Sequence, residues 1–101
     1  MHLVEILLPV AGNDGQPFHP QKYTDIRAEL TRRFGGMTAF ARAPAHGEFH
    51  DRGAVVHDDI IVFEVMSETL DSEWWAAFRK RVEQEFAQDE IVIRASTITR
   101  L

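Results

Sequence analysis

The stretch that decides the fold is "IIVFEVMSETLDSEWWAAFRKRVEQEF", residues 60–86. Its first seven residues are mostly β-branched or aromatic and too few for a helix, which predicts a central strand over 60–66. Asp71 then suits the N-cap of a helix. The apolar residues that follow recur at helical spacing and form one stripe, which consists of Trp75, Phe78, Val82 and Phe86.

The rest of the chain repeats this pairing of strands with amphipathic helices. Residues 2–9 alternate as a half-buried strand, and a helix is expected to begin near Pro20 and to stop at Gly35. Strands are also expected over 37–43 and 90–99. The apolar stripe of the first helix consists of Tyr23, Ile26, Leu30 and Phe34.

The resulting order, β-α-β-β-α-β, predicts a ferredoxin-like α+β fold that occupies residues 1–101 as a single domain. In this fold we expect a four-stranded antiparallel sheet in the spatial order 4-1-3-2. Right-handed crossovers place both helices on one face of that sheet. The other face is left uncovered by the chain itself.

Composition excludes several classes of function. The formal charge of −5 argues against nucleic acid and against an anionic membrane as the main partner. There is no cysteine, which removes disulfides, iron–sulfur clusters and cysteine-based zinc sites. The start "MHLVEILLPV" is interrupted by Glu5 and has neither a basic segment nor a cleavage site, so we expect a soluble cytoplasmic protein.

Strand periodicity assigns both apolar and charged residues to the uncovered sheet face. Across the strand order its charges read Arg94, Glu5, Glu64, Arg42, so each glutamate is expected beside an arginine of a neighbouring strand. The remaining residues assigned to this face are Leu3, Leu7, Phe40, Val62, Val92 and Ile98.

An apolar face of this size is rarely left in water, so we expect a face-to-face homodimer. Two functions then fit: a non-catalytic domain that binds a small ligand, and a cofactor-independent enzyme that acts on a small organic molecule. In the enzyme, Glu5 or Glu64 is the candidate general base, and Arg42 or Arg94 anchors the ligand. Structural ion pairs across the interface are the alternative. Further candidate ligand contacts are Phe40, Trp74 and His50.

The segment "HGEFHDRGAVVHDD", residues 46–59, contains three histidines but does not predict a metal site. A hairpin that closes at "DRG" would pair His50 with Ala54 and Gly47 with His57, which separates His57 from the other two histidines. His46 and His50 alone need a helix to converge on one ion, and Pro44 and Gly47 disfavour one. A polar hairpin, an interface element and a lid over the pocket remain open alternatives.

RNA binding is a third class, because RNA recognition motifs share this topology. Those domains place stacking aromatic residues on the two central strands, where this chain has Glu5 and Glu64, which repel phosphate.

Three stretches carry a resemblance to a known family: "RAELTRRFGGMTAFARAPAHGEF" (27–49), "DDIIVFEVM" (58–66) and "EWWAAFRKRVEQEFAQDEIVIRAS" (73–96). The chain resembles a family of small uncharacterised bacterial proteins related to the dimeric α/β-barrel group. That group includes cofactor-independent monooxygenases, isomerases and stress-response proteins. The resemblance implies a dimeric barrel and no cofactor, and it transfers no catalytic residue.

Overall fold

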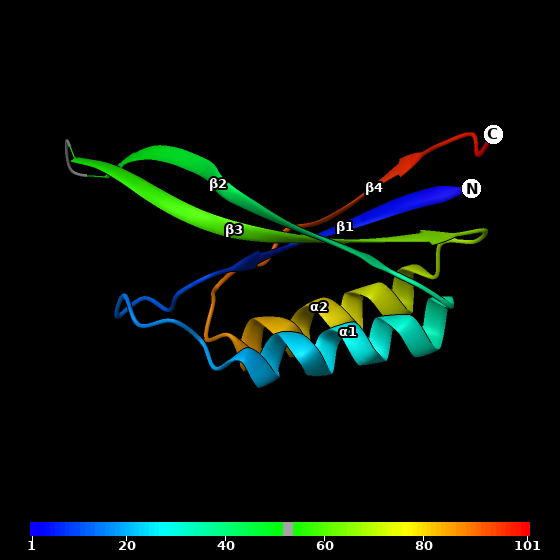
Figure 1. The fold of residues 1–101 in the computed structure, drawn as a ribbon, viewed down its shortest axis with the longest axis horizontal. Coiled ribbons are helices and arrows are strands. Elements are labelled where there is room, and N and C mark those ends of the chain that lie inside the picture. Colours follow the sequence, from blue (N-terminus) through cyan, green and yellow to red (C-terminus); the bar gives the residue numbers. More distant parts are fainter. Residues whose placement is uncertain (52–53) are drawn as a thin grey trace.

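The computed structural model describes residues 1–51 and 54–101, with side chains for 1–39 and 60–101, and has the predicted order of elements. The four strands form one antiparallel sheet in the order β2-β3-β1-β4, which is the predicted 4-1-3-2 order read from the other edge. Both helices lie on the same side of this sheet (Figure 1). The ferredoxin-like α+β fold is therefore confirmed. The elements are β1 (His2–Pro9), α1 (Pro20–Phe34), β2 (Thr38–Asp51), β3 (Ala54–Ser67), α2 (Ser72–Glu85) and β4 (Ile93–Thr97).

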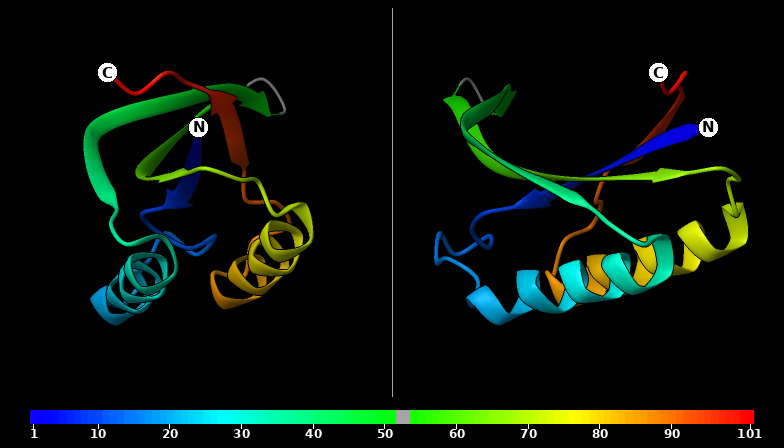
Figure 2. Two further views of the ribbon diagram at one scale, coloured as in Figure 1. Left: turned by 90° about the vertical axis from the view of Figure 1, so that its right-hand side faces the viewer. Right: turned by 45° about the vertical axis from the view of Figure 1, so that its right-hand side comes forward.

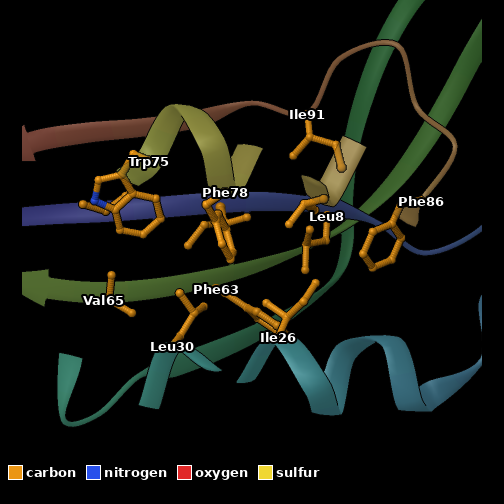
Figure 3. Packing of buried hydrophobic residues seen from close by; sticks show 12 residues of the cluster. Leu8, Ile26, Leu30, Phe63, Val65, Trp75, Phe78, Phe86 and Ile91 are labelled. Atoms are coloured by element: carbon orange, nitrogen blue, oxygen red, sulfur yellow. The ribbon is translucent and has the colours of Figure 1, made fainter. Parts of the chain in front are cut away.

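The core lies between the sheet and the two helices (Figure 3). Alternate residues of β1 and β3 point into it, and the predicted stripe of each helix meets them. Tyr23 and Phe34, at the two ends of the α1 stripe, are only partly buried. The fully enclosed members of the core are Val4, Ile6, Leu8, Ile26, Leu30, Phe63, Val65, Trp75, Phe78, Val82, Phe86 and Ile91.

Side-chain caps mark the start of both helices, and a glycine marks the end of α1. Helix α1 begins at Pro20, where the Nδ1 of His19 accepts a hydrogen bond from the backbone N–H of Gln21. It stops at Gly35, whose φ of 79° is left-handed and therefore favours glycine. The Asp71 carboxylate accepts the N–H of Trp74 at 3.1 Å, which confirms this residue as the N-cap of α2.

Replacing Asp71 with alanine is expected to lower the free energy of unfolding by about 1 kcal/mol, because the first turn of α2 loses its acceptor. Asp71→Asn is the matched control, since its amide oxygen can still cap the helix while the negative charge is removed. Urea titrations of both variants check this. Equal losses in the two variants would show that charge, and not capping, carries the effect.

A tyrosine fixes the loop between β1 and α1 to the end of the first strand. The Tyr23 hydroxyl donates to the carbonyl of Pro9 at 2.6 Å. Burial raises the pKa of this phenol above its usual value, because the charged form would lose its hydration. The loop is thereby held against the core at the end of the molecule opposite Gly35.

The structure corrects the predicted lengths of three strands. Strands β2 and β3 each contain 14 residues and reach almost to the turn, whereas β4 has only five. The strand predicted over 37–43 ended just before Pro44 and Gly47. In the structure, β2 continues past them and its register with β3 shifts between Ala41 and His46. A proline lacks the N–H that a regular ladder requires, so a shift around Pro44 accommodates it.

The hairpin register also differs by one residue from the prediction. Asp51 pairs with Ala54, His50 with Val55, and Glu48 with His57. The connection between the strands therefore has two residues and not three. The predicted separation of His57 from His46 and His50 depended on the other register, and this basis is lost. The side chains of these histidines lie outside the described residues.

The sheet is strongly twisted, and its hairpin end curves away from the helices (Figures 1 and 2). Strand β1 pairs with β3 only over residues 60–67, so residues 54–59 of β3 pair with β2 alone. The outer half of the hairpin is therefore a two-stranded arm. At the opposite end of the molecule lie both chain termini, the end of β3 and the end of α1 (Figure 1).

Candidate functional site

The sheet face turned away from the helices, here called the open face, carries two of the predicted charges side by side. Glu5 of β1 lies opposite Arg94 of β4, and the Arg94 Nε donates to the Glu5 Oε1 at 3.1 Å. The Glu5 side chain is only 19% exposed, whereas that of Arg94 is 56% exposed. The predicted contact between these two residues is confirmed. An ion pair this exposed on one side contributes little to stability.

Glu64 occupies the neighbouring central strand. In the register it lies directly opposite Glu5, so two carboxylates share adjacent positions. Its partner on β2 is Thr38, so the predicted position of Arg42 directly beside Glu64 is wrong: Arg42 comes four residues later along β2. The side chains of Arg42, Phe40 and His50 lie outside the described residues, so their predicted roles stay predictions. Among the described side chains, none forms an ion pair with Glu64.

Apolar side chains surround these charges on the open face. Met66 is 49% exposed and Val92 is 46% exposed, which is high for residues of this size. Val62 is only 2% exposed although it does not belong to the core beneath the sheet. In the register it lies between Leu7 and Phe40. The open face thus has apolar positions on three of its four strands.

A cavity of about 590 Å³, here called the end cavity, lies where β3 and α1 end. It joins the edge of the open face to the end of the helix layer. Of the predicted site residues whose side chains are described, only Glu64 lines it, together with Leu3 of the predicted face. Glu5, Arg94 and Trp74 do not. The other lining residues are Met1, Arg33, Phe34, Gly35, Gly36, Met37, Thr38, Val65, Met66, Ser67, Glu68 and Arg100.

Sequence reasoning missed most of this cavity, because its lining comes from the ends of elements and not from their faces. One signal in the sequence was available. The chain has three methionines, and all three line the end cavity. Methionine side chains are flexible and polarizable, and they are frequent at binding surfaces that adapt to a ligand.

Trp74 is half-buried beside the end cavity and not on its wall. Its ring stacks on Phe78, with centroids 5.1 Å apart, and meets Trp75 edge-on. The guanidinium carbon of Arg33 lies 4.3 Å from the Trp74 ring centroid, and an Arg33 nitrogen lies 3.5 Å from the Asp71 carboxylate. Arg33 therefore connects the cavity wall to Trp74.

A second hollow, of about 210 Å³, lies between β4 and the start of α2. Arg94 lines it together with Leu70, Trp75 and Ile93. It is smaller and more apolar, and neither Glu5 nor Glu64 reaches it. Glu64 and Arg94, predicted to act in one pocket, therefore line different ones.

Two further structural tests apply only to the described residues. Among them, no three histidine, aspartate or glutamate side chains come together as a metal site would require. Likewise, within the described parts of the chain no helix has the length and apolar content needed to cross a bilayer.

Comparison with known proteins places the chain by its fold. No family model and no curated protein matches its sequence. Solved structures do match. The divalent cation tolerance protein CutA1 from Thermus thermophilus superposes with a TM-score of 0.61 at 16% identity, over 99% of this chain and 86% of that one. A phage SAM lyase in complex with S-methyl-5'-thioadenosine gives 0.59 at 15% identity, over 94% and 79%.

The PII-like protein CutA from Nostoc sp. PCC 7120, in its apo form, gives a TM-score of 0.50 at 14% identity, over 97% of this chain and 81% of that one. At such low identity these likenesses establish a shared ferredoxin-like fold and nothing about activity. The predicted relation to the dimeric α/β-barrel group stays a prediction.

Proposed function

We propose that this chain is a small-ligand-binding domain that holds its ligand in the end cavity and forms a homodimer through the open face. The observation that carries the proposal is the end cavity itself. Its volume of about 590 Å³ lies within the range typical of small-molecule sites, about 300–1,000 Å³. Its wall combines apolar side chains with a few charged groups, as such sites do.

The comparison with the phage SAM lyase supports a small ligand in this fold. That lyase was solved in complex with S-methyl-5'-thioadenosine, a compound with a flat base and a thioether. This is an analogy of fold, and it supplies a first probe compound and not a ligand assignment.

Self-association is supported by the open face. Met66 and Val92 leave nearly half of their surface in water, and neither helix of the chain covers that side of the sheet. A second copy would remove this apolar area from water. It would also desolvate the ion pair between Glu5 and Arg94, which stays compensated because its two partners are already in contact.

An enzyme that works without a cofactor is the alternative, and the position of Glu64 favours it. This carboxylate lines the end cavity together with Arg33 and Arg100, so it has the placement of a general base beside cations that hold a substrate. In that case Glu64→Gln would abolish turnover while the substrate still bound. In a pure binding domain, the same variant changes affinity only.

Two variants test the end cavity. Glu64→Gln removes a charge from its wall, and Gly36→Leu fills it: a Cβ at Gly36 meets no atom within 4 Å, and its φ is not left-handed. Glu90→Gln is the control, because Glu90 is exposed and lies outside the cavity. A panel of compounds that includes S-methyl-5'-thioadenosine is screened for any compound that raises the Tm of the wild type. We expect such a compound to lose this effect on Glu64→Gln and on Gly36→Leu, and to keep it on Glu90→Gln.

Calorimetry then measures the affinity of each variant. A loss of about tenfold, equivalent to about 1.4 kcal/mol, is expected for Glu64→Gln. A compound that stabilises Gly36→Leu as strongly as the wild type binds elsewhere and contradicts the proposal.

A further inference from the structure

The walls of the end cavity carry charges of both signs, which restricts the ligands it suits. This inference rests on the proposed function. We propose that the ligand is a zwitterionic small molecule, with an ammonium and an anionic group on one apolar and preferably aromatic body. Positive charge comes from Arg33 at the end of α1 and from Arg100, and negative charge comes from Glu64 on β3 and from Glu68 just after it.

These four charges do not neutralise one another. Among the described side chains, no ion pair joins either glutamate to either arginine. Arg33 instead contacts Asp71, at 3.5 Å, outside the cavity. While the cavity holds water, the charges are hydrated. A ligand displaces that water, and each charge left without a partner then costs free energy.

A ligand with a charge of one sign satisfies only one pair of side chains. An anion pairs with the arginines and leaves Glu64 desolvated without a partner. A cation pairs with the glutamates and leaves Arg100 desolvated without a partner. A zwitterion pairs with both. A singly charged compound of the same shape therefore binds more weakly than a zwitterion, because it leaves one pair of charged side chains without a partner.

The end of helix α1 adds to the negative side of the cavity. The last carbonyls of a helix carry partial negative charge, which favours a cation nearby. Gly35 and Gly36, which follow α1 directly, line the cavity, and a Cβ at either position would meet open space. An ammonium group can therefore approach this backbone closely.

The apolar part of the wall suits an aromatic body. Met1, Met37 and Met66 line the cavity together with Leu3 and Phe34. Thioether sulfurs make favourable contacts with aromatic rings, on the order of 0.3–1.5 kcal/mol each. A flat ring is accordingly a better partner for this wall than a second charge would be.

The protein contains its own reporter for this ligand. Arg33 lies over Trp74, and both tryptophans of the chain belong to the same aromatic cluster. An anionic group that draws Arg33 into the cavity weakens its contacts with Trp74 and Asp71. Tryptophan fluorescence should therefore change on binding.

Three compounds with one body test the class: phenylalanine, 2-phenylethylamine, which lacks the carboxylate, and 3-phenylpropanoate, which lacks the amine. Each is titrated into the full chain, and tryptophan fluorescence and calorimetry are recorded. We expect phenylalanine to bind at least about tenfold more tightly than either singly charged compound, equivalent to about 1.4 kcal/mol.

Two variants assign the charges. Arg100→Gln should weaken phenylalanine and 3-phenylpropanoate but not 2-phenylethylamine, which no longer leaves that arginine without a partner. Glu64→Gln should weaken phenylalanine and 2-phenylethylamine but not 3-phenylpropanoate, for the same reason. A singly charged compound that binds as tightly as phenylalanine overturns the inference and leaves the ligand site in place. If S-methyl-5'-thioadenosine binds and none of the three phenyl compounds does, the inference is likewise overturned and the ligand site stays in place. If none of these four compounds binds, both this inference and the proposed function fail.

Discussion

Replacing Phe78 with alanine is expected to destabilise the protein by about 3–5 kcal/mol. Phe78 is 2% exposed and lies at the centre of the helix layer, where it stacks on Trp74 and meets Trp75 edge-on at 5.4 Å. Truncation removes this burial and leaves a cavity between rigid rings that cannot close around it. Because a domain of this size has a total stability of about 5–15 kcal/mol, the variant should be marginally folded.

Urea unfolding followed by tryptophan fluorescence measures this loss. Lys80→Ala is the matched control, because Lys80 is exposed on the same helix and should change the free energy of unfolding by less than about 0.5 kcal/mol. A loss below about 1 kcal/mol for Phe78→Ala would mean that the aromatic cluster is not the centre of the core.

Charging the open face should separate the copies that we propose to associate there. Met66→Asp combined with Val92→Asp places two carboxylates where apolar surface would be buried, and each unpaired buried charge costs several kcal/mol. Both residues are exposed in the single chain, so the fold itself should tolerate the change. We expect sedimentation velocity to report a single chain for this variant.

Ala76→Asp combined with Ala77→Asp is the control. These residues are exposed on α2, on the far side of the molecule from the open face, and they add the same charge. This control should sediment like the wild type. If both double variants dissociate, net charge is responsible and the open face is not the interface.

Periodicity predicted the fold well because burial acts on alternate residues of a strand and on one stripe of a helix. Val4, Ile6 and Leu8 face the core, and the contact between Arg94 and Glu5 followed from the same alternation. A ladder that continues through a proline was not predictable from turn signals. The predicted strands around 44–59 were therefore shorter than the observed ones, and the predicted hairpin register was wrong by one residue.

The candidate site was only half predictable for a physical reason. Glu64 was identified because the alternation of strand residues assigns it to the uncovered face of the sheet. Arg33, Glu68 and Arg100 lie at or beyond the ends of α1, β3 and β4, where no period marks them, and only the arrangement of these elements in the fold brings them to one cavity. Glu29 lies four residues before Arg33 on the same helix, at the spacing of a helical ion pair. Glu29 instead meets Arg81 of α2, at 2.6 Å, which leaves Arg33 at the cavity.

Light scattering on the purified wild type tests the central claim most directly, namely that the open face is covered by another copy of the chain. At micromolar concentration the claim predicts a mass of at least twice the 11.6 kDa of one chain. A single species of 11.6 kDa, unchanged as the concentration rises tenfold, would contradict it.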